Sequence, residues 1–322
     1  GFRTLGSGNA AFRVSAMGFG CMGLNHHRSQ HPDEKTCIRL VHEAIERGVT
    51  LFDTAESYGY HANEILTGKA LKGYADRVFA TTKFGHKFVN GVQVRTEEDS
   101  TPANIRRVCE NSLRNLGVET LGIFYQHRID PKVAPEEVAG VMADLIREGK
   151  ILHWGISEAT EEYLRRAHAV CPVTAVQNRY SMMARWHEAL FPVLEELGVG
   201  FVAFSPLANG LLTDCYTADS TFDPATDYRA SMPQFRRESF ERNRTLFELV
   251  EGLAEEHRAT PSQIALAWMM NKRPWIVPIP GTRHLCRLKE NIGAAAIRLP
   301  AGQVQAVDDA LAAMPMSEVF GG

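Results

Sequence analysis

The hydrophobic positions of the chain fall into two alternating patterns. Short apolar runs rich in β-branched and aromatic residues alternate with segments whose apolar residues recur every three or four positions. The runs are too short for helices and apolar on both faces, which is typical of buried parallel strands. The expected strands are Val14–Met17, Val49–Phe52, Val78–Thr82, Leu121–Tyr125, Ile151–Ile156, Val173–Val176, Gly200–Phe204 and Trp275–Ile279.

The segments between these runs carry helix start signals. Asp33 and Thr101 stand where N-caps are expected, Pro135 suits a first helical position, and Thr260 with Gln263 has the spacing of a capping box. Strand and helix therefore alternate about eight times, which predicts an α/β fold of the (β/α)8 barrel type. A doubly wound open sheet alternates in the same way, so the number of repeats is what favours the barrel.

Three further features refine this prediction. The stretch Gly6-Ser7-Gly8 lies between short extended segments and indicates an N-terminal hairpin that could cover the bottom of the barrel. The stretch Pro206–Phe240 has no clear period, so we expect a long loop after the seventh strand, with a lid as its possible role. Pro278 fits poorly inside the eighth strand because it lacks an N–H donor. We expect residues 1–322 to form one barrel domain, although the length would allow two.

Composition narrows the function classes. Apolar residues make up 44% of the chain and charged residues 23%, which is ordinary for a globular enzyme. The net charge of −3 gives no basic excess for nucleic acid or an anionic membrane. The six cysteines form no C-x-x-C pair, which argues against a disulfide framework or a zinc site and fits a reducing compartment. With no long apolar run and no signal-peptide pattern, we expect a cytoplasmic protein.

Chemically capable side chains follow the C-terminal ends of the apolar runs. These side chains are Asp53, Lys83, His127, Ser157, Gln177, Asn178 and Ser205. Polar residues end many strands simply because water begins there. In a barrel, however, all of these ends meet at one mouth, which is where barrel active sites lie.

Asp53, Tyr58, Lys83 and His127 form a set suited to carbonyl chemistry. A lysine ammonium near Tyr58 favours the phenolate, so we expect the pKa of Tyr58 to fall from about 10. Such a tyrosine can give a proton to an oxygen that gains charge. Asp53 would hold Lys83, and His127 could orient a carbonyl oxygen. This set suits the reduction of a carbonyl group if a hydride source is bound.

Three motifs resemble the active-site signature of the aldo-keto reductases: Leu51–Gly59 (LFDTAESYG), Thr81-Thr82-Lys83 and Tyr125-Gln126-His127-Arg128. A later block, from Ile276 to Arg283 and on to Asn291, also resembles that family and accounts for Pro278 inside the last strand. The resemblance extends from about Thr4 to about Arg298. It implies a (β/α)8 barrel that binds a nicotinamide dinucleotide, with Tyr58 as proton donor and Lys83, Asp53 and His127 completing a catalytic tetrad.

The same resemblance implies a set of cofactor contacts. The residues are Met22, Gly23, Asp53, Ser157, Gln177, Asn178, Phe204, Ser205, Leu207, Gly210, Gly281, Thr282, Arg283, Arg287, Glu290 and Asn291. Met22 and Gly23 would contact the cofactor through their backbone, and Ser157 with Asn178 or its neighbour Gln177 would hold the nicotinamide carboxamide.

The remaining contacts follow the dinucleotide outward. Phe204 would stack on the nicotinamide ring in place of the usual tyrosine. Ser205, Leu207 and Gly210 would lie along the pyrophosphate, while Glu290 and Asn291 would meet the adenine.

The chain departs from the family pattern at two places. Gly281-Thr282 replaces a common Lys-Ser pair, so Arg283 would face the adenosine 2′-phosphate, with Thr282 and Arg287 assisting. An arginine that can grip a phosphate, with no acid beside it, favours NADP(H) over NAD(H). Arg179 replaces the usual acid after Gln177-Asn178, and the sequence gives no prediction of what this change does.

Two other motifs of the chain suggest different sites but fit less well. Gly18–Gly23 matches G-x-G-x-x-G, but about ten residues separate it from the next helix, and Asp53 follows Gly23 by 30 residues rather than about 20. A Rossmann site is therefore disfavoured. His26, His27 and His31 could suggest a metal, yet no carboxylate recurs at ligand spacing, so we expect solvated or substrate-lining histidines and no metal.

The sequence therefore predicts an NADP(H)-dependent oxidoreductase that interconverts aldehydes or ketones and alcohols. The alternative is a redox-sensing subunit that holds NADP(H) with little turnover, because such a protein would keep the same four residues. Phe88, Met182 and Trp186 in the barrel-mouth loops suggest a moderately apolar small-molecule substrate. Nucleic acid and membranes are not expected as partners, and the oligomeric state stays open.

Overall fold

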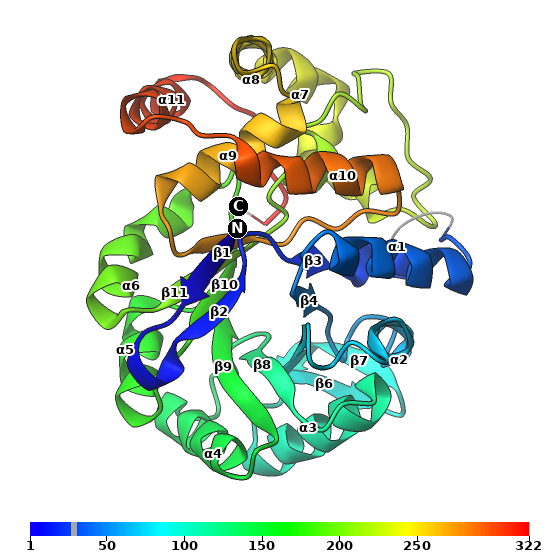
Figure 1. Cartoon of the computed structure of the whole chain (residues 1–322), viewed down its shortest axis with the longest axis vertical. Helices are drawn as coiled ribbons and strands as arrows, with labels where there is room; N and C mark the ends of the chain where they lie inside the picture. The colour runs from blue at the N-terminus through cyan, green and yellow to red at the C-terminus, as the bar shows by residue number, and fades with distance from the viewer. Residues whose placement is uncertain (27–30, 322) are drawn as a thin grey trace.

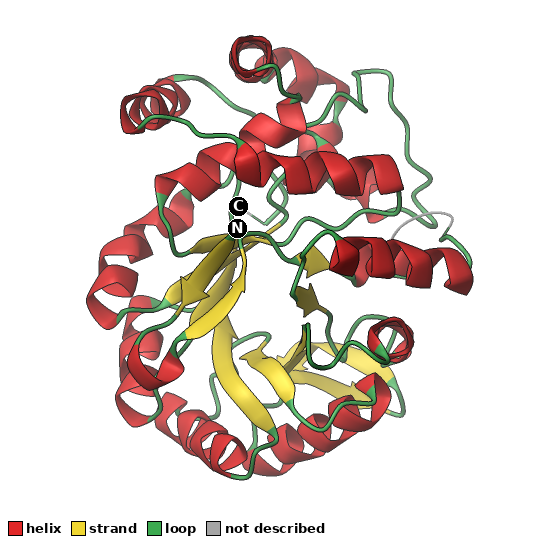
Figure 2. Ribbon diagram, viewed as in Figure 1, coloured by secondary structure: helices red, strands yellow, loops and turns green. Residues whose placement is uncertain are grey.

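An eight-stranded parallel sheet forms the centre of the protein, and helices surround it (Figures 1 and 2). The computed structural model describes residues 1–26 and 31–321. Its strands follow the order β12-β11-β10-β9-β8-β5-β4-β3. Their bounds are β3 Phe19–Gly20, β4 Leu51–Asp53, β5 Phe79–Phe84, β8 Leu121–Gln126, β9 Ile151–Ser157, β10 Ala175–Arg179, β11 Gly200–Phe204 and β12 Ile276–Pro278.

Backbone hydrogen bonds close the sheet into a cylinder. The N–H of Gly18 donates to the Pro278 oxygen at 2.9 Å, and the N–H of Gly20 donates to the Pro280 oxygen at 3.4 Å. These bonds join the segment of the first barrel strand to that of the last. The predicted (β/α)8 barrel is therefore confirmed, and Pro278 is accommodated at the C-terminal end of β12.

The closing seam needs a glycine at position 20. A Cβ at this position would lie 2.7 Å from the backbone oxygen of Ile279, closer than real side chains approach. We expect Gly20→Ala to destabilise the fold by about 1–3 kcal/mol, because the strands would have to separate. Urea unfolding measures this, with Gly140→Ala as the matched control, since a Cβ at Gly140 meets nothing within 4 Å. Equal unfolding midpoints for the two variants would contradict the steric argument.

The predicted first strand, Val14–Met17, was wrong. Val14 belongs to β2 (Phe12–Ser15), which pairs antiparallel with β1 (Phe2–Leu5), and the first barrel strand is β3. The run is apolar because Leu5, Phe12 and Val14 pack into the barrel interior beside the starts of the strands. The predicted N-terminal hairpin and its place at the barrel bottom are confirmed.

Helices enclose the cylinder in the alternation that the pattern predicted. The barrel helices are α1 Glu34–Glu46, α2 Ala62–Leu71, α3 Pro102–Leu116, α4 Pro135–Arg147, α5 Glu161–Val170, α6 Phe191–Leu197, α9 Pro261–Lys272 and α10 Leu285–Gly293. Asp33 caps α1 by accepting from the N–H of Thr36 at 2.9 Å, and Thr260 with Gln263 forms the expected capping box of α9. The predicted starts of these two helices are therefore confirmed.

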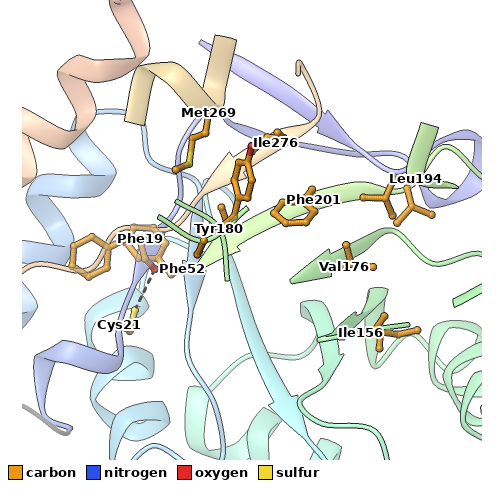
Figure 3. Packing of buried hydrophobic residues seen from close by; sticks show 14 of the residues in the cluster. Phe19, Cys21, Phe52, Ile156, Val176, Tyr180, Leu194, Phe201, Met269 and Ile276 are labelled. Atoms are coloured by element: carbon orange, nitrogen blue, oxygen red, sulfur yellow. Dashed lines mark hydrogen bonds between the residues drawn. The ribbon is translucent and has the colours of Figure 1, made fainter. Parts of the chain in front are cut away.

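Two apolar layers hold the barrel together. The inner layer fills the cylinder with side chains such as Leu51, Ile123 and Val202. The outer layer lies between strands and helices, where Phe201 of β11 and Leu194 of α6 are buried together (Figure 3). Because both faces of every central strand are covered, the apolar runs show no alternation with polar residues.

Two excursions extend the basic barrel. The hairpin β6 (His86–Val89) and β7 (Val92–Glu98) follows β5, and a long segment follows β11. From Ser205 to Arg236 that segment contains only short 3-10 turns, and α7 (Arg237–Arg242) and α8 (Arg244–His257) then lead to α9. The aperiodic stretch predicted after the seventh strand is confirmed except where α7 begins.

The C-terminal part of the chain packs outside the ring of barrel helices. Both α8 and α11 (Ala301–Ala313) contact α9 (Figure 1). Across the described residues, no helix is both long enough and apolar enough to cross a membrane.

Candidate active site

Three neighbouring strands bring the predicted tetrad to the barrel mouth. Asp53 ends β4, Lys83 lies near the end of β5, and His127 directly follows β8. The Lys83 Nζ contacts Asp53 Oδ1 at 2.5 Å, and it lies 3.5 Å from the hydroxyl oxygen of Tyr58. The structure therefore places the tyrosine, the lysine and the aspartate in one contiguous cluster.

The ion pair beneath Tyr58 is buried and fully hydrogen-bonded. Lys83 is 1% exposed and also donates to the backbone oxygen of Thr54 at 2.7 Å. Asp53 Oδ2 accepts from Thr81 Oγ1 and from Gln177 Nε2, each at 2.9 Å. Burial acts to lower the pKa of Lys83, but Asp53 and Tyr58 outweigh it and the net direction is upward. Lys83 therefore stays an ammonium at neutral pH.

The predicted downward pKa shift of Tyr58 was wrong. Burial raises the pKa of the phenol, the charge of Lys83 lowers it, and Asp53 raises it again, so the net direction is upward. The carboxylate that stabilises the lysine partly cancels its effect on the phenol. Tyr58 is therefore a neutral phenol at neutral pH, the form that can donate a proton.

His127 is a neutral imidazole at the same edge of the mouth. Burial holds its pKa well below the usual value, and the charges of His86, Lys83 and Arg128 lower it further. Its Nδ1 lies 3.4 Å from the hydroxyl oxygen of Ser57. When Ser57 donates this bond, Nε2 carries the ring proton and can donate to a ligand oxygen.

The turn that carries Tyr58 is anchored to the neighbouring strand. Asn63 accepts from Thr54 Oγ1 at 2.6 Å and donates to the backbone oxygen of Cys21 at 2.9 Å. Tyr60 and His61 adopt left-handed backbone conformations, with φ of 42° and 74°. The side-chain bonds of Asn63 fix the loops after β3 and β4 relative to each other and so hold the turn over Lys83.

Two buried glutamates near this turn have opposite environments. Glu56 is 1% exposed and neither carboxyl oxygen has a hydrogen-bond partner, although Arg107 lies 3.6 Å away. Burial raises the pKa of Glu56 to about 7. Glu64 is also buried, but it contacts His61 Nδ1 at 3.3 Å and accepts from Thr82, Ser112 and Asn115, and these contacts hold its pKa below the usual value against the effect of burial.

The raised pKa of Glu56 makes the stability depend on pH. The folded protein keeps this proton up to about pH 7 and the unfolded chain loses it near 4.5, so Glu56 lowers stability as pH rises between these values. We expect Glu56→Gln to be about 3 kcal/mol more stable than the wild type at pH 8 and nearly equal at pH 4.5. Urea unfolding at both pH values measures this. Glu64→Gln is the matched control and should lose stability at pH 8, so a loss with Glu56→Gln as well would contradict the argument.

The ends of β9 and β10 carry the residues assigned to the carboxamide. Ser157 is buried at the end of β9, and its Oγ accepts from Arg128 at 3.3 Å. Gln177 reaches into the barrel and bonds Asp53, whereas Asn178 turns to the backbone N–H of Glu158 at 2.8 Å. Of the two predicted alternatives, the structure brings Gln177 to the tetrad and directs Asn178 elsewhere.

The loop after β11 contains several residues in strained, left-handed backbone conformations, as ligand-binding loops often do. Phe204 ends β11, and Ser205, Ala208 and Asn209 then adopt φ values of 49°, 48° and 63°, followed by Gly210 at 104°. Left-handed non-glycine residues are costly and cluster at ligand clamps. Leu207 is the N-cap of the 3-10 turn Ala208–Gly210 in this loop. The predicted pyrophosphate residues therefore lie together in one unusual turn beside Phe204.

The residues assigned to the adenosine end lie between β12 and α10. Gly281, Thr282 and Arg283 connect these two elements. Arg287 donates to Glu290 Oε2 at 2.7 Å and to Asp214 Oδ1 at 2.8 Å, and Asn291 is buried. Arg287 is therefore bound to two carboxylates, one of them from the long segment after β11.

Two histidines that follow barrel strands pack on the tetrad, and His26 is one of the histidines expected to be solvated or to line the substrate site. His26 follows the 3-10 turn that contains Met22 and Gly23, and its ring stacks on that of Tyr58 at 5.7 Å. His86 packs on His127 at 4.5 Å. Position alone gave the signal, because both histidines follow barrel strands.

The loop histidines and the apolar residues expected at the mouth lie in different environments. His27 lies outside the described residues, and elsewhere in the described chain no three histidine, cysteine, aspartate or glutamate side chains gather as a metal site. Met182 does not suit the predicted apolar pocket, because it is fully buried in the outer core. Phe88 packs on Tyr60 at 4.7 Å, and Trp186 is 41% exposed.

The comparisons agree with one another. The model of the aldo/keto reductase family matches residues 16–312. A probable aldo-keto reductase 1 from Glycine max is 38% identical over 317 residues, covering 98% of this chain and 90% of that protein. Glycerol dehydrogenase AKR11B4 from Gluconobacter oxydans superposes with a TM-score of 0.87 at 27% identity over 99% of each chain. An aldo-keto reductase from Klebsiella pneumoniae in complex with NADPH has a TM-score of 0.73 at 23% identity, covering 95% of this chain and 94% of that one.

Proposed function

This chain belongs to the aldo/keto reductase family, and from that premise we propose that it is an NADP(H)-dependent oxidoreductase that interconverts aldehydes or ketones and alcohols. The observation that carries the proposal is the buried Lys83, in contact with both Asp53 and the hydroxyl of Tyr58 at the barrel mouth. A phenol that is neutral and lies beside an ammonium is a proton donor for an oxygen that gains negative charge.

Tyr58 is the proposed general acid of the reductive direction. Its Oη gives its proton to the carbonyl oxygen, and the phenolate that forms is stabilised by the ammonium of Lys83. Asp53 keeps Lys83 charged and in place, so the stabilising charge is present before the reaction begins. In the oxidative direction, the same oxygen takes the proton from an alcohol.

His127 positions the carbonyl group. As a neutral imidazole, it donates a hydrogen bond from Nε2 to the carbonyl oxygen without competing as an acid. Its contact with Ser57 fixes the ring orientation.

The residues at the mouth fit a nicotinamide dinucleotide. Ser157 and Gln177 supply a hydroxyl and an amide at neighbouring strand ends, Phe204 supplies an aromatic face, and the strained turn after it suits a pyrophosphate. The reduced nicotinamide, when bound, supplies the hydride that the carbonyl carbon accepts. Ser157 and Gln177 would hold its carboxamide and keep the ring against Phe204.

The preference for NADP(H) over NAD(H) rests on Arg283. It lies between β12 and α10, where a guanidinium can pair with a 2′-phosphate. The aldo-keto reductase from K. pneumoniae in complex with NADPH supports the choice of NADP(H) by analogy. Arg287 would assist less, because Glu290 and Asp214 already hold it. Titrating the protein with NADPH and NADH in parallel tests the preference, and equal affinities would reject it.

The reaction itself is tested by following NADPH absorbance with a panel of aldehydes and ketones. We expect consumption with at least one of them and formation of the corresponding alcohol. Tight NADPH retention with no consumption across the panel would instead favour the redox-sensing subunit.

A further inference from the structure

Arg128 lies beside the proposed catalytic residues without an acidic partner. It directly follows His127, and its Nη1 donates to the His127 backbone oxygen at 2.6 Å and to Ser157 Oγ at 3.3 Å. Both acceptors are neutral, and no carboxylate of the described residues forms an ion pair with it. Its charge acts to lower the pKa values of both Tyr58 and His127, as expected of a cation near these side chains.

Arg179 is a second arginine at the mouth, and most of its donors have no hydrogen-bond acceptor among the described residues. It ends β10 and is 9% exposed, yet within the described part of the chain its guanidinium has one hydrogen bond, to Asn209 Oδ1 at 3.3 Å. The rings of Phe204 and Phe320 lie 5.0 and 5.4 Å from its central carbon. Burial lowers the pKa of Arg179 and outweighs the opposing effects of Tyr228 and Glu158, and the charge of Arg128 adds to the lowering.

Another buried arginine, Arg229, has its charge balanced by a neighbouring carboxylate. Arg229 is 6% exposed, and its Nε and NH2 bind the two oxygens of Asp227 at 2.9 and 2.5 Å. A buried charge without such a partner is costly. Among the described residues, no carboxylate pairs with the Arg179 guanidinium in this way, so its position at the mouth calls for another explanation.

Glu158, an acidic residue close to both arginines, does not neutralise both of them. Glu158 lies between them after β9, but its Oε2 contacts His187 at 3.0 Å and its Oε1 accepts from the backbone N–H of Arg179 at 3.3 Å. One carboxylate therefore faces two guanidinium groups. Because β8 and β10 are separated only by β9, their ends lie about 10 Å apart, a span that two arginine side chains can bridge around one anion.

We propose that Arg128 and Arg179 bind the carboxylate of the substrate, so that this protein acts on carbonyl compounds that carry a carboxylate group. The inference rests on the proposed oxidoreductase function. A carboxylate suits a guanidinium because two parallel N–H donors match its two oxygens. The reactive carbonyl would then reach Tyr58 and His127 while the carboxylate stays between the two arginines.

The test compares 4-carboxybenzaldehyde with benzaldehyde, which differ only in the anionic group. We expect the wild type to show a kcat/KM at least about tenfold higher for the carboxylate. Arg128→Met and Arg179→Met should each lower the ratio of the two kcat/KM values by about 10- to 100-fold. Arg114→Met, at the C-terminal end of α3, is the control and should leave the ratio unchanged.

Benzoate and benzyl alcohol as competitors of the wild type give a test that needs no variant. Benzoate should inhibit the more strongly of the two. A wild type that prefers benzaldehyde, or variants that raise the Kd of NADPH while leaving the ratio unchanged, would overturn the carboxylate proposal alone. NADPH consumption with neither these aldehydes nor any compound of the wider carbonyl panel would overturn the proposed function as well.

Discussion

Replacing Tyr58 with phenylalanine should lower kcat for carbonyl reduction by about 10²- to 10⁴-fold while leaving the Kd of NADPH nearly unchanged. The substitution removes the only atom of this residue that can give a proton. The ring remains, so its packing against His26 and His127 is kept. Steady-state kinetics and a fluorescence titration with NADPH separate the two effects.

Tyr60 provides the matched control for this experiment. It belongs to the same turn, and its ring packs on His61 at 4.2 Å and on Phe88. Tyr60→Phe removes a phenolic hydroxyl of the same kind, away from Lys83, and should keep most of the activity. Turnover of Tyr58→Phe within tenfold of the wild type would show that the proton comes from another group.

The barrel mouth could be predicted because parallel strands end on one side. Asp53, Lys83 and His127 each follow an apolar run, and this pattern alone brought them together. The first strand was missed because β3 contains only Phe19 and Gly20, while the more apolar run before it fills the barrel bottom. An apolar run shows only that a segment is buried, and the hairpin that fills the bottom of the barrel is as buried as a barrel strand.

Two details of the site depend on the folded arrangement and could not be predicted from the sequence pattern. Gln177 and Asn178 are adjacent in β10 and so point to opposite sides, but both sides of this strand are buried and the pattern cannot tell inside from outside. The pKa of Tyr58 depends on how far burial and Asp53 offset Lys83, which only the folded arrangement gives. Met182 was likewise assigned to a pocket, because the sequence shows that it follows a barrel strand but does not show that its side chain is buried.

The buried ion pair beneath Tyr58 is the second place where one substitution should have a large effect. Lys83→Met leaves the carboxylate of Asp53, which is 3% exposed, with only Thr81 and Gln177 as donors. We expect a loss of about 3–5 kcal/mol in the free energy of unfolding, because the buried charge has lost its partner. Catalysis should fall as well, since the phenolate of Tyr58 would form without a neighbouring cation.

The double variant Asp53→Asn with Lys83→Met separates stability from catalysis. It removes both charges, so urea unfolding should recover much of the stability lost in Lys83→Met, while kcat should stay as low as in the single variant. Lys69→Met is the surface control: its pair with Glu34 is exposed, and its removal should cost less than about 1 kcal/mol. A double variant that regains activity would mean that Lys83 serves only to balance Asp53 and that the acidity of Tyr58 has another source.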